Sequence, residues 1–177
     1  MIEDFQFYTK PMDHQLKEFY NSRDNEYYAF TFEMGTGKTK LTIDQFIYLY
    51  GRQEIDGVLV VAPNGVHQNW AIDELPKHCD PSIHRKVFVW QTNHAGNKGY
   101  QREFEELLEY PQLAVLLINY DALNTKRGLK ACESFLRQRA TFLVLDESHR
   151  IKTPGARRTK TALQLGKLSK YRRILTG

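Results

Sequence analysis

The sequence contains little cysteine. Only Cys79 and Cys132 occur among its 177 residues, far apart and without a Cys-x-x-Cys spacing. This disfavours a disulfide-stapled secreted scaffold and a cysteine-based zinc site. No stretch approaches the ~20 apolar residues that a membrane span needs, and residues 1–5 lack the basic start and apolar run of a secretory signal. We expect an intracellular protein with reduced cysteines and no membrane contact.

The excess of positive over negative charge is also small. The net charge of +4 permits a polyanionic partner without requiring one, and the six histidines show no metal-ligand spacing. The basic residues crowd the last part of the chain: Arg150, Lys152, Arg157, Arg158, Lys160, Lys167, Lys170, Arg172 and Arg173. They predict either a contact surface for nucleic acid or a second domain, or a solvated helix face.

Short apolar runs alternate with helical stretches. The predicted strands are Tyr27–Phe32, Gly57–Ala62, Lys86–Trp90, Leu113–Asn119, Thr141–Leu145 and Arg172–Leu175. The predicted helices are Pro11–Tyr20, Lys38–Tyr50, Val66–Leu75, Gln101–Glu109, Gly128–Arg137 and Arg157–Leu168, and Asn93–Gly99 is a predicted loop. Continuously apolar strands are typical of a parallel sheet covered on both faces. The order predicts one α/β domain over residues 1–177, in three layers, with a mainly parallel central sheet flanked by helices.

A glycine-rich segment, residues 33–39, follows the first predicted strand and opens a helix. It ends in Gly37-Lys38-Thr39, as a phosphate-binding loop does, but Phe32 stands where the first glycine of the usual pattern would be. Gly35 and Gly37 allow a tight turn whose N–H groups face phosphates. Lys38 can reach the terminal phosphates, and the Thr39 hydroxyl can bind Mg²⁺. The segment predicts nucleotide binding.

Two carboxylates, Asp146 and Glu147, end the fifth predicted strand. The carboxyl ends of parallel strands share one edge of a sheet, so we expect both side chains near the phosphate loop. Asp146 is suited to hold Mg²⁺, and Glu147 to position and deprotonate an attacking water. Together with the loop, the pair predicts nucleoside-triphosphate hydrolysis.

These motifs resemble the first RecA-like lobe of superfamily 2 helicases and translocases, especially the Snf2-like group. Residues 33–39 are similar to motif I, 58–70 to motif Ia, 117–123 to motif Ib, 146–149 to motif II and 174–177 to the start of motif III. Residues 150–154 are similar to the Snf2 continuation, with Thr153 in place of asparagine. Phe32 and Thr36 also depart from the family pattern, but neither removes a catalytic group. The resemblance implies a P-loop NTPase fold.

The resemblance also assigns roles. It implies nucleotide contacts at Gln15, Met34, Gly35, Thr36, Gly37, Lys38 and Thr39, with Gln15 reading adenine. Catalysis would fall to Lys38, Asp146, Glu147 and His149, and the metal to Thr39 and Asp146. Coupling to motion between lobes would involve His149, Thr176 and Gly177. Nucleic acid would contact Pro63, Asn64, Gly65, Tyr120 and Lys152.

The function implied is that of an ATP- and Mg²⁺-dependent motor that translocates on double-stranded DNA. Motifs IV to VI, with their arginine fingers, would lie in a second lobe that these residues do not include. An arginine finger contributes ~10³–10⁵ in rate, so we expect the 177 residues alone to bind ATP weakly and hydrolyse it very slowly. The short connections favour a bacterial or viral cytoplasmic source, with a nuclear one possible.

Three alternatives remain open at the level of sequence. A strand-separating helicase or a restriction-system motor subunit could have nearly the same first lobe. A non-hydrolysing, nucleotide-dependent binding module is a reading from another class, and the intact Lys38, Asp146 and Glu147 speak against it. A simple P-loop kinase is disfavoured by the motif II and motif III segments.

Overall fold

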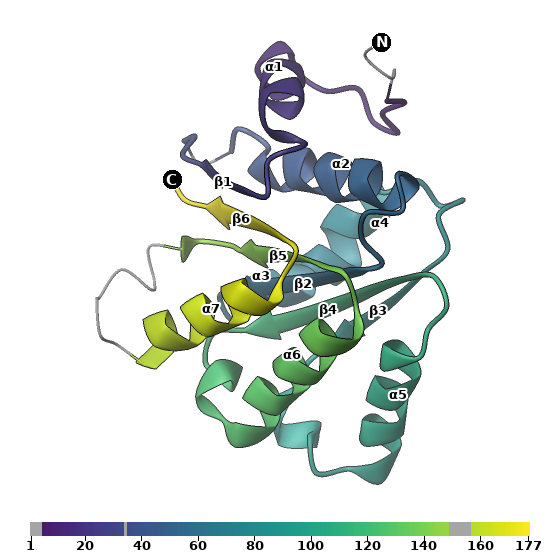
Figure 1. Cartoon of the computed structure of the whole chain (residues 1–177), viewed down its shortest axis with the longest axis vertical. Coiled ribbons are helices and arrows are strands. Elements are labelled where there is room, and N and C mark those ends of the chain that lie inside the picture. The colour runs from purple at the N-terminus through teal and green to yellow at the C-terminus, as the bar shows by residue number, and fades with distance from the viewer. Residues whose placement is uncertain (1–4, 34, 149–156) are drawn as a thin grey trace.

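The computed structural model describes residues 5–33, 35–148 and 157–177. Six parallel strands form one sheet in the order β1-β6-β5-β2-β4-β3 (Figure 1). The strands are β1 (Tyr27–Phe30), β2 (Gly57–Ala62), β3 (Arg85–Val89), β4 (Leu113–Asn119), β5 (Thr141–Leu145) and β6 (Tyr171–Leu175). The predicted α/β fold with a parallel central sheet is confirmed.

Helices cover both faces of the sheet. One face carries α1 (Asp13–Ser22), α2 (Lys38–Gly51), α3 (Val66–Asn69) and α4 (Leu75–His78), and the other carries α5 (Lys98–Leu108), α6 (Lys126–Gln138) and α7 (Arg157–Leu168). Among the described residues, no helix combines the length and apolarity that crossing a bilayer requires.

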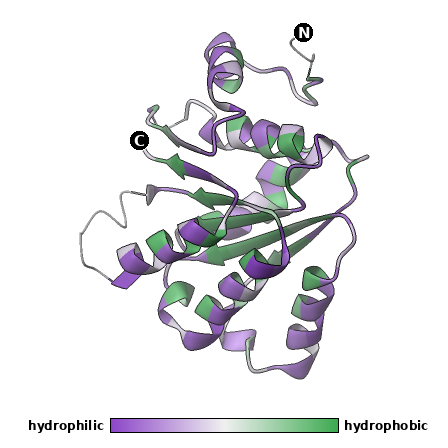
Figure 2. Cartoon of the chain, in the orientation of Figure 1, coloured by the Kyte–Doolittle hydropathy of each residue, from purple (hydrophilic) through white to green (hydrophobic). Residues whose placement is uncertain are grey.

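The core has two halves because successive side chains of a strand point to opposite faces. In β2, Val58 and Val60 pack with α1 and α2, whereas Leu59 and Val61 pack with α5 and α6. All of β2 is buried. Figure 2 shows the consequence, with apolar strands at the centre and polar residues on the outer sides of the helices.

Several boundaries differ from the predictions. Strand β1 ends at Phe30 rather than Phe32, and residues 31–33 lead from the strand into the phosphate loop. The predicted loop 93–99 overlaps a short 3₁₀ turn, Thr92–His94, and its last two residues already belong to α5, which begins at Lys98. There the Asn97 side chain accepts hydrogen bonds from Gly99 N and Tyr100 N, capping the helix.

The predicted helix Val66–Leu75 is interrupted. A π-turn over Trp70–Glu74 separates α3 from α4, and within it Leu75 N donates to Trp70 O. Pro76, in the first turn of α4, has no N–H to donate to the preceding turn. The bond from Leu75 N to Trp70 O spans five residues rather than four, which accommodates the missing donor, and α4 then continues to His78.

Candidate nucleotide-binding site

The glycines of residues 33–39 adopt backbone conformations that favour glycine. Gly35 has φ 79° and Gly37 has φ 78°, both in the left-handed region. A β-carbon at Gly37 would lie 2.1 Å from Gln15 Nε2. Gly37 is also the N-cap residue of α2, and it has no side chain with which to cap the first N–H groups of that helix. These groups can therefore receive an anion.

Gln15 supports this loop from α1. It is 2% exposed, and its Nε2 donates to Thr36 O and Gly37 O, both at 3.2 Å. Its Oε1 accepts from Met12 N at 2.9 Å. Both amide hydrogens are thus used by the loop, and reading adenine N7 would require exchanging one of these bonds. The adenine role stays a prediction, while the contact with the loop is a structural finding.

Lys38 lies at the mouth of the loop. Its Nζ donates to Phe32 O at 2.7 Å and to Glu33 O at 3.0 Å. Both partners are neutral carbonyl oxygens, and charged phosphate oxygens form stronger, charge-assisted hydrogen bonds with an ammonium group. The Thr36 hydroxyl donates to Glu33 O at 2.7 Å, which closes the turn from its other side.

Asp146 follows β5 and is buried. Its Oδ2 accepts from Trp70 Nε1 at 3.0 Å, and its Oδ1 accepts from Glu147 N at 2.9 Å. Burial raises the pKa of the Asp146 carboxyl, and the hydrogen bond from Trp70 opposes that rise. Asp146 N continues the sheet by donating to Val61 O at 2.8 Å. The carboxylate is thus fixed by the sheet behind it and by two donors in front.

The backbone of Glu147 is in the left-handed region, with φ 51°. For a residue with a side chain this conformation costs roughly 1–3 kcal/mol, and such residues cluster at functional sites. The conformation turns the chain immediately after Asp146 and places Glu147 beside the loop.

A cavity of about 370 Å³ joins these parts. It is lined by Gly35, Gly37, Lys38, Thr39, Lys40, Val66, Asn69, Trp70, Glu74, Lys77, His78, Asp146 and Glu147. The loop and the acidic strand end, more than a hundred residues apart in sequence, therefore share one cavity as expected. Met34, His149 and Lys152, which were also predicted site residues, lie outside the described residues.

The sequence reading missed one wall of the cavity. Residues 66, 69, 70, 74, 77 and 78 line it from α3, the π-turn and α4. Their spacing of three and four residues is helical and could have identified a single face. Burial raises the pKa of Glu74, and burial followed by the charge of Lys40 lowers the pKa of His78. This wall is polar and partly shielded from water.

The other predicted residues lie after the carboxyl ends of their strands. Pro63, Asn64 and Gly65 follow β2, with Asn64 exposed. Tyr120 follows β4 but is buried, and its hydroxyl donates to Asp146 O at 2.7 Å. Its expected contact with nucleic acid stays a prediction. Such a contact would require the buried side chain to turn outward and give up its hydrogen bond to Asp146 O.

Thr176 and Gly177 follow β6. Thr176 N donates to Phe30 O at 3.1 Å. The segment after β6 thus lies beside the start of the phosphate loop. The coupling role of these two residues stays a prediction.

Comparison with known proteins identifies this arrangement. A model of the SNF2-related domain matches residues 28–177. The chain belongs to the SNF2-related domain family. This confirms the resemblance to Snf2-like proteins, and the match extends from β1 through the acidic strand end to β6.

Relatives of this SNF2-related domain include three named proteins. It is 30% identical over 148 residues to "ISWI chromatin-remodeling complex ATPase CHR17" of Arabidopsis thaliana, covering 82% of this chain and 12% of that protein. It is 29% identical over 146 residues to "Chromatin structure-remodeling complex subunit snf21" of Schizosaccharomyces pombe, covering 82% of this chain and 11% of that protein. It is 34% identical over 123 residues to "Chromodomain-helicase-DNA-binding protein 1-like" of Danio rerio, covering 68% of this chain and 11% of that protein.

The SNF2-related domain spans only 11% to 12% of the length of these relatives. Most of each relative therefore has no counterpart in these 177 residues. The relatives come from a plant, a yeast and a fish, so they give no support to the expected bacterial or viral source.

Proposed function

We propose that this SNF2-related domain is the ATP-binding lobe of a DNA-dependent motor ATPase, which hydrolyses ATP to ADP and phosphate when paired with a second RecA-like lobe. One observation carries the proposal: a single cavity brings Lys38 and Thr39 together with Asp146 and Glu147. A phosphate-binding lysine, a hydroxyl and two carboxylates are the groups that nucleotide hydrolysis requires. The relatives named as ATPases support it.

The donors in the cavity fit Mg²⁺. The Thr39 hydroxyl and the Asp146 carboxylate are oxygen donors, and the described residues contain no cluster of three or more His, Cys, Asp or Glu side chains that could enclose a metal. Mg²⁺ typically keeps several waters and takes one or two carboxylates beside substrate phosphates, which agrees with this sparse set. When bound, the ion would neutralise charge on the phosphates.

The chain's own groups would act as follows. Lys38 would exchange its two carbonyl partners for phosphate oxygens, and the uncapped start of α2 would face the same phosphates. The Asp146 carboxylate would hold the hydrated ion, while Glu147 would orient the attacking water and accept its proton. Gln15 would keep the loop open from behind.

We expect replacement of Lys38 with alanine to weaken Mg·ATP binding by about ten- to a hundredfold, because hydrogen bonds to charged groups contribute about 1.5–3 kcal/mol. Titration calorimetry of the 177-residue chain measures the effect. Lys167→Ala, which removes an exposed lysine of α7, is the matched control and should bind normally. Equal affinity of Lys38→Ala and wild type would contradict the proposed site.

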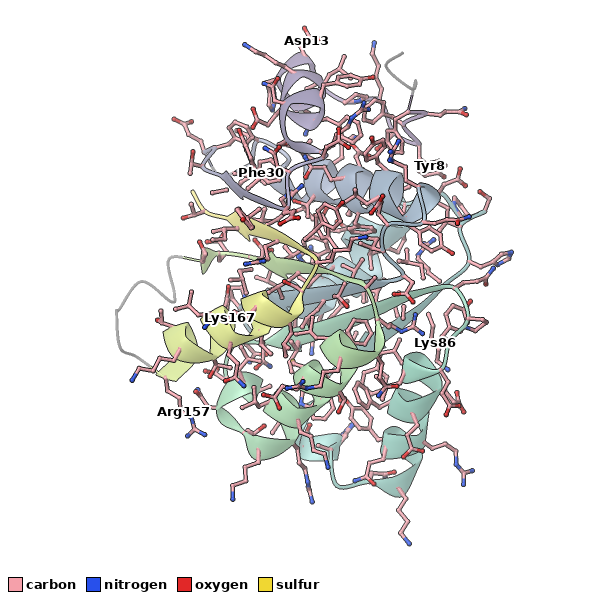
Figure 3. All side chains as sticks on the ribbon, viewed as in Figure 1. Tyr8, Asp13, Phe30, Lys86, Arg157 and Lys167 are labelled. Atoms are coloured by element: carbon pink, nitrogen blue, oxygen red, sulfur yellow. The ribbon has the colours of Figure 1, made fainter. Side chains whose placement is uncertain are left out.

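DNA binding is proposed from the family and from exposed basic residues such as Arg157, at the outer end of α7 (Figure 3). If the contacts are to phosphates, the affinity for a short labelled duplex should fall steeply between about 50 and 200 mM salt. Each phosphate contact should contribute about −0.9 to the slope of the logarithm of the binding constant against the logarithm of the salt concentration. Fluorescence anisotropy provides the measurement. Undetectable binding, or binding that is flat with salt, would count against a DNA-dependent motor.

A further inference from the structure

The domain contains two buried tryptophans that differ in one respect. Trp70 is 1% exposed and Trp90 is 5% exposed. The Trp70 indole N–H donates to Asp146 Oδ2 at 3.0 Å, whereas the Trp90 indole N–H has no hydrogen-bond partner within the described part of the chain. The two residues thus offer similar burial with and without a polar contact.

The contact of Trp70 lies inside the candidate site. Trp70 is the first residue of the π-turn, and its carbonyl accepts the wide-ring hydrogen bond from Leu75 N. Turns of this kind are rare and occur frequently at functional sites. Trp70 and Asp146 both line the cavity that the phosphate loop also lines.

The chemistry of the indole suits it to orient a carboxylate. Its N–H is a donor only, on a ring whose orientation is fixed by two side-chain torsions. Together with the bond from Glu147 N to Oδ1, it ties each carboxylate oxygen of Asp146 to a separate donor. Each oxygen has a further lone pair, so the carboxylate is held in one orientation and can still accept hydrogen bonds from the waters of a metal ion.

We propose that Trp70 is a positioning residue for the magnesium site, holding the Asp146 carboxylate in the orientation that receives the hydrated ion. This inference rests on the proposed function, because it assumes that Mg·ATP occupies the cavity. Groups that orient a metal's ligands from outside its first coordination shell typically contribute 10–100-fold to metal affinity. Trp70 does not touch the substrate in this scheme; it acts through Asp146.

The test compares Trp70→Phe with Trp90→Phe in the 177-residue chain. Both changes replace a buried indole with a smaller aromatic ring, but only the first removes a hydrogen bond. ATP binding is measured by calorimetry in EDTA and over a series of Mg²⁺ concentrations. We expect Trp70→Phe to raise by about tenfold or more the Mg²⁺ concentration at which half of the Mg²⁺-dependent increase in ATP affinity is reached. ATP binding without metal should be unchanged. Trp90→Phe should leave both quantities at their wild-type values.

A second readout does not depend on Trp70→Phe folding well. In Trp90→Phe, Trp70 is the only remaining tryptophan, so its emission reports directly on the Asp146 contact. Adding Mg²⁺ in the presence of ATP should shift that emission, and Asp146→Asn in the same background should abolish the shift.

The outcomes separate the two proposals. If wild type shows no Mg²⁺-dependent ATP binding, the proposed function fails and this inference fails with it. If wild type binds but Trp70→Phe and Trp90→Phe have the same Mg²⁺ dependence, or Trp70 emission does not respond to Mg²⁺, only the positioning role is overturned. Equal loss of ATP binding by Trp70→Phe in EDTA and in Mg²⁺ would also overturn it, because that pattern indicates a merely structural role.

Discussion

Replacing Asp44 with alanine is expected to destabilise the fold by about 3–5 kcal/mol, because it leaves a buried ammonium group without its partner. Lys40 Nζ lies 2.5 Å from Asp44 Oδ2 within α2, and the two side chains are 7% and 3% exposed. Phe7 covers the pair, with its ring centroid 5.4 Å from the ammonium. Lys40 also lines the candidate cavity, but its side chain is only 7% exposed, so most of the cost of its buried charge remains after the change.

Removing both charges should behave differently. The double variant Lys40→Met with Asp44→Leu fills a similar volume without a buried charge, and such replacements are often neutral or stabilising. Urea denaturation at neutral pH compares wild type, Asp44→Ala and the double variant. The exposed pair Lys86–Glu106, at 2.6 Å, serves as a control, since Glu106→Ala should barely move the midpoint. Equal midpoints for Asp44→Ala and wild type would contradict a buried, coupled pair.

The pH dependence of the same series follows from the pKa of Asp44, which burial raises from 3.8 to about 6. Between these two values the folded state binds a proton that the unfolded state has released. The contribution of this carboxyl to stability is therefore greatest at low pH and is lost as pH rises toward 6. The double variant, which lacks the carboxyl, should lose this slope in denaturation experiments repeated at pH values across that window.

The second large effect concerns Glu147. Its change to glutamine is expected to lower single-turnover ATP hydrolysis by about 10²–10⁴-fold, because the amide cannot accept a proton from the attacking water. ATP binding should persist, since Glu147→Gln preserves side-chain size and leaves Lys38 and the loop intact. Single-turnover assays with protein in excess over labelled ATP can detect the slow hydrolysis expected of these residues alone.

Glu109→Gln, at the exposed end of α5, is the matched control for this experiment. It should hydrolyse ATP at the wild-type rate. Unchanged hydrolysis in Glu147→Gln would point to a contaminating enzyme or to a module that binds nucleotide without hydrolysing it. Loss of ATP binding in Glu147→Gln would instead indicate that the substitution had changed the left-handed backbone conformation at residue 147 and disturbed the site.

The strands were predictable because burial on both faces imposes continuous apolar runs. Gly57–Ala62 and Thr141–Leu145 have the predicted bounds, since each is buried throughout and is followed by polar or turn-forming residues. The interruption of residues 66–75 could not be predicted in the same way. A π-turn adds only one residue to a turn, and an apolar pattern with a period near 3.6 tolerates that addition.

The site shows a similar division. The loop and the acidic pair were predictable from local spacing, because glycine conformation and strand ends are short-range properties. The contact between Trp70 and Asp146 joins residues 76 positions apart and leaves no local pattern. The pair Lys40–Asp44 has the spacing of an ordinary solvated helix pair, and its burial comes from tertiary packing, which includes Phe7 of the N-terminal segment.

The place of β6 has a mechanical consequence. It is bonded to β1 on one side and to β5 on the other, and Thr176 N adds a bond to Phe30 O. A pull on the chain at Gly177 would load both ladders together, with β1 leading to the phosphate loop and β5 to Asp146. Tension that reaches β6 would therefore be passed to the strands that lead to both parts of the cavity.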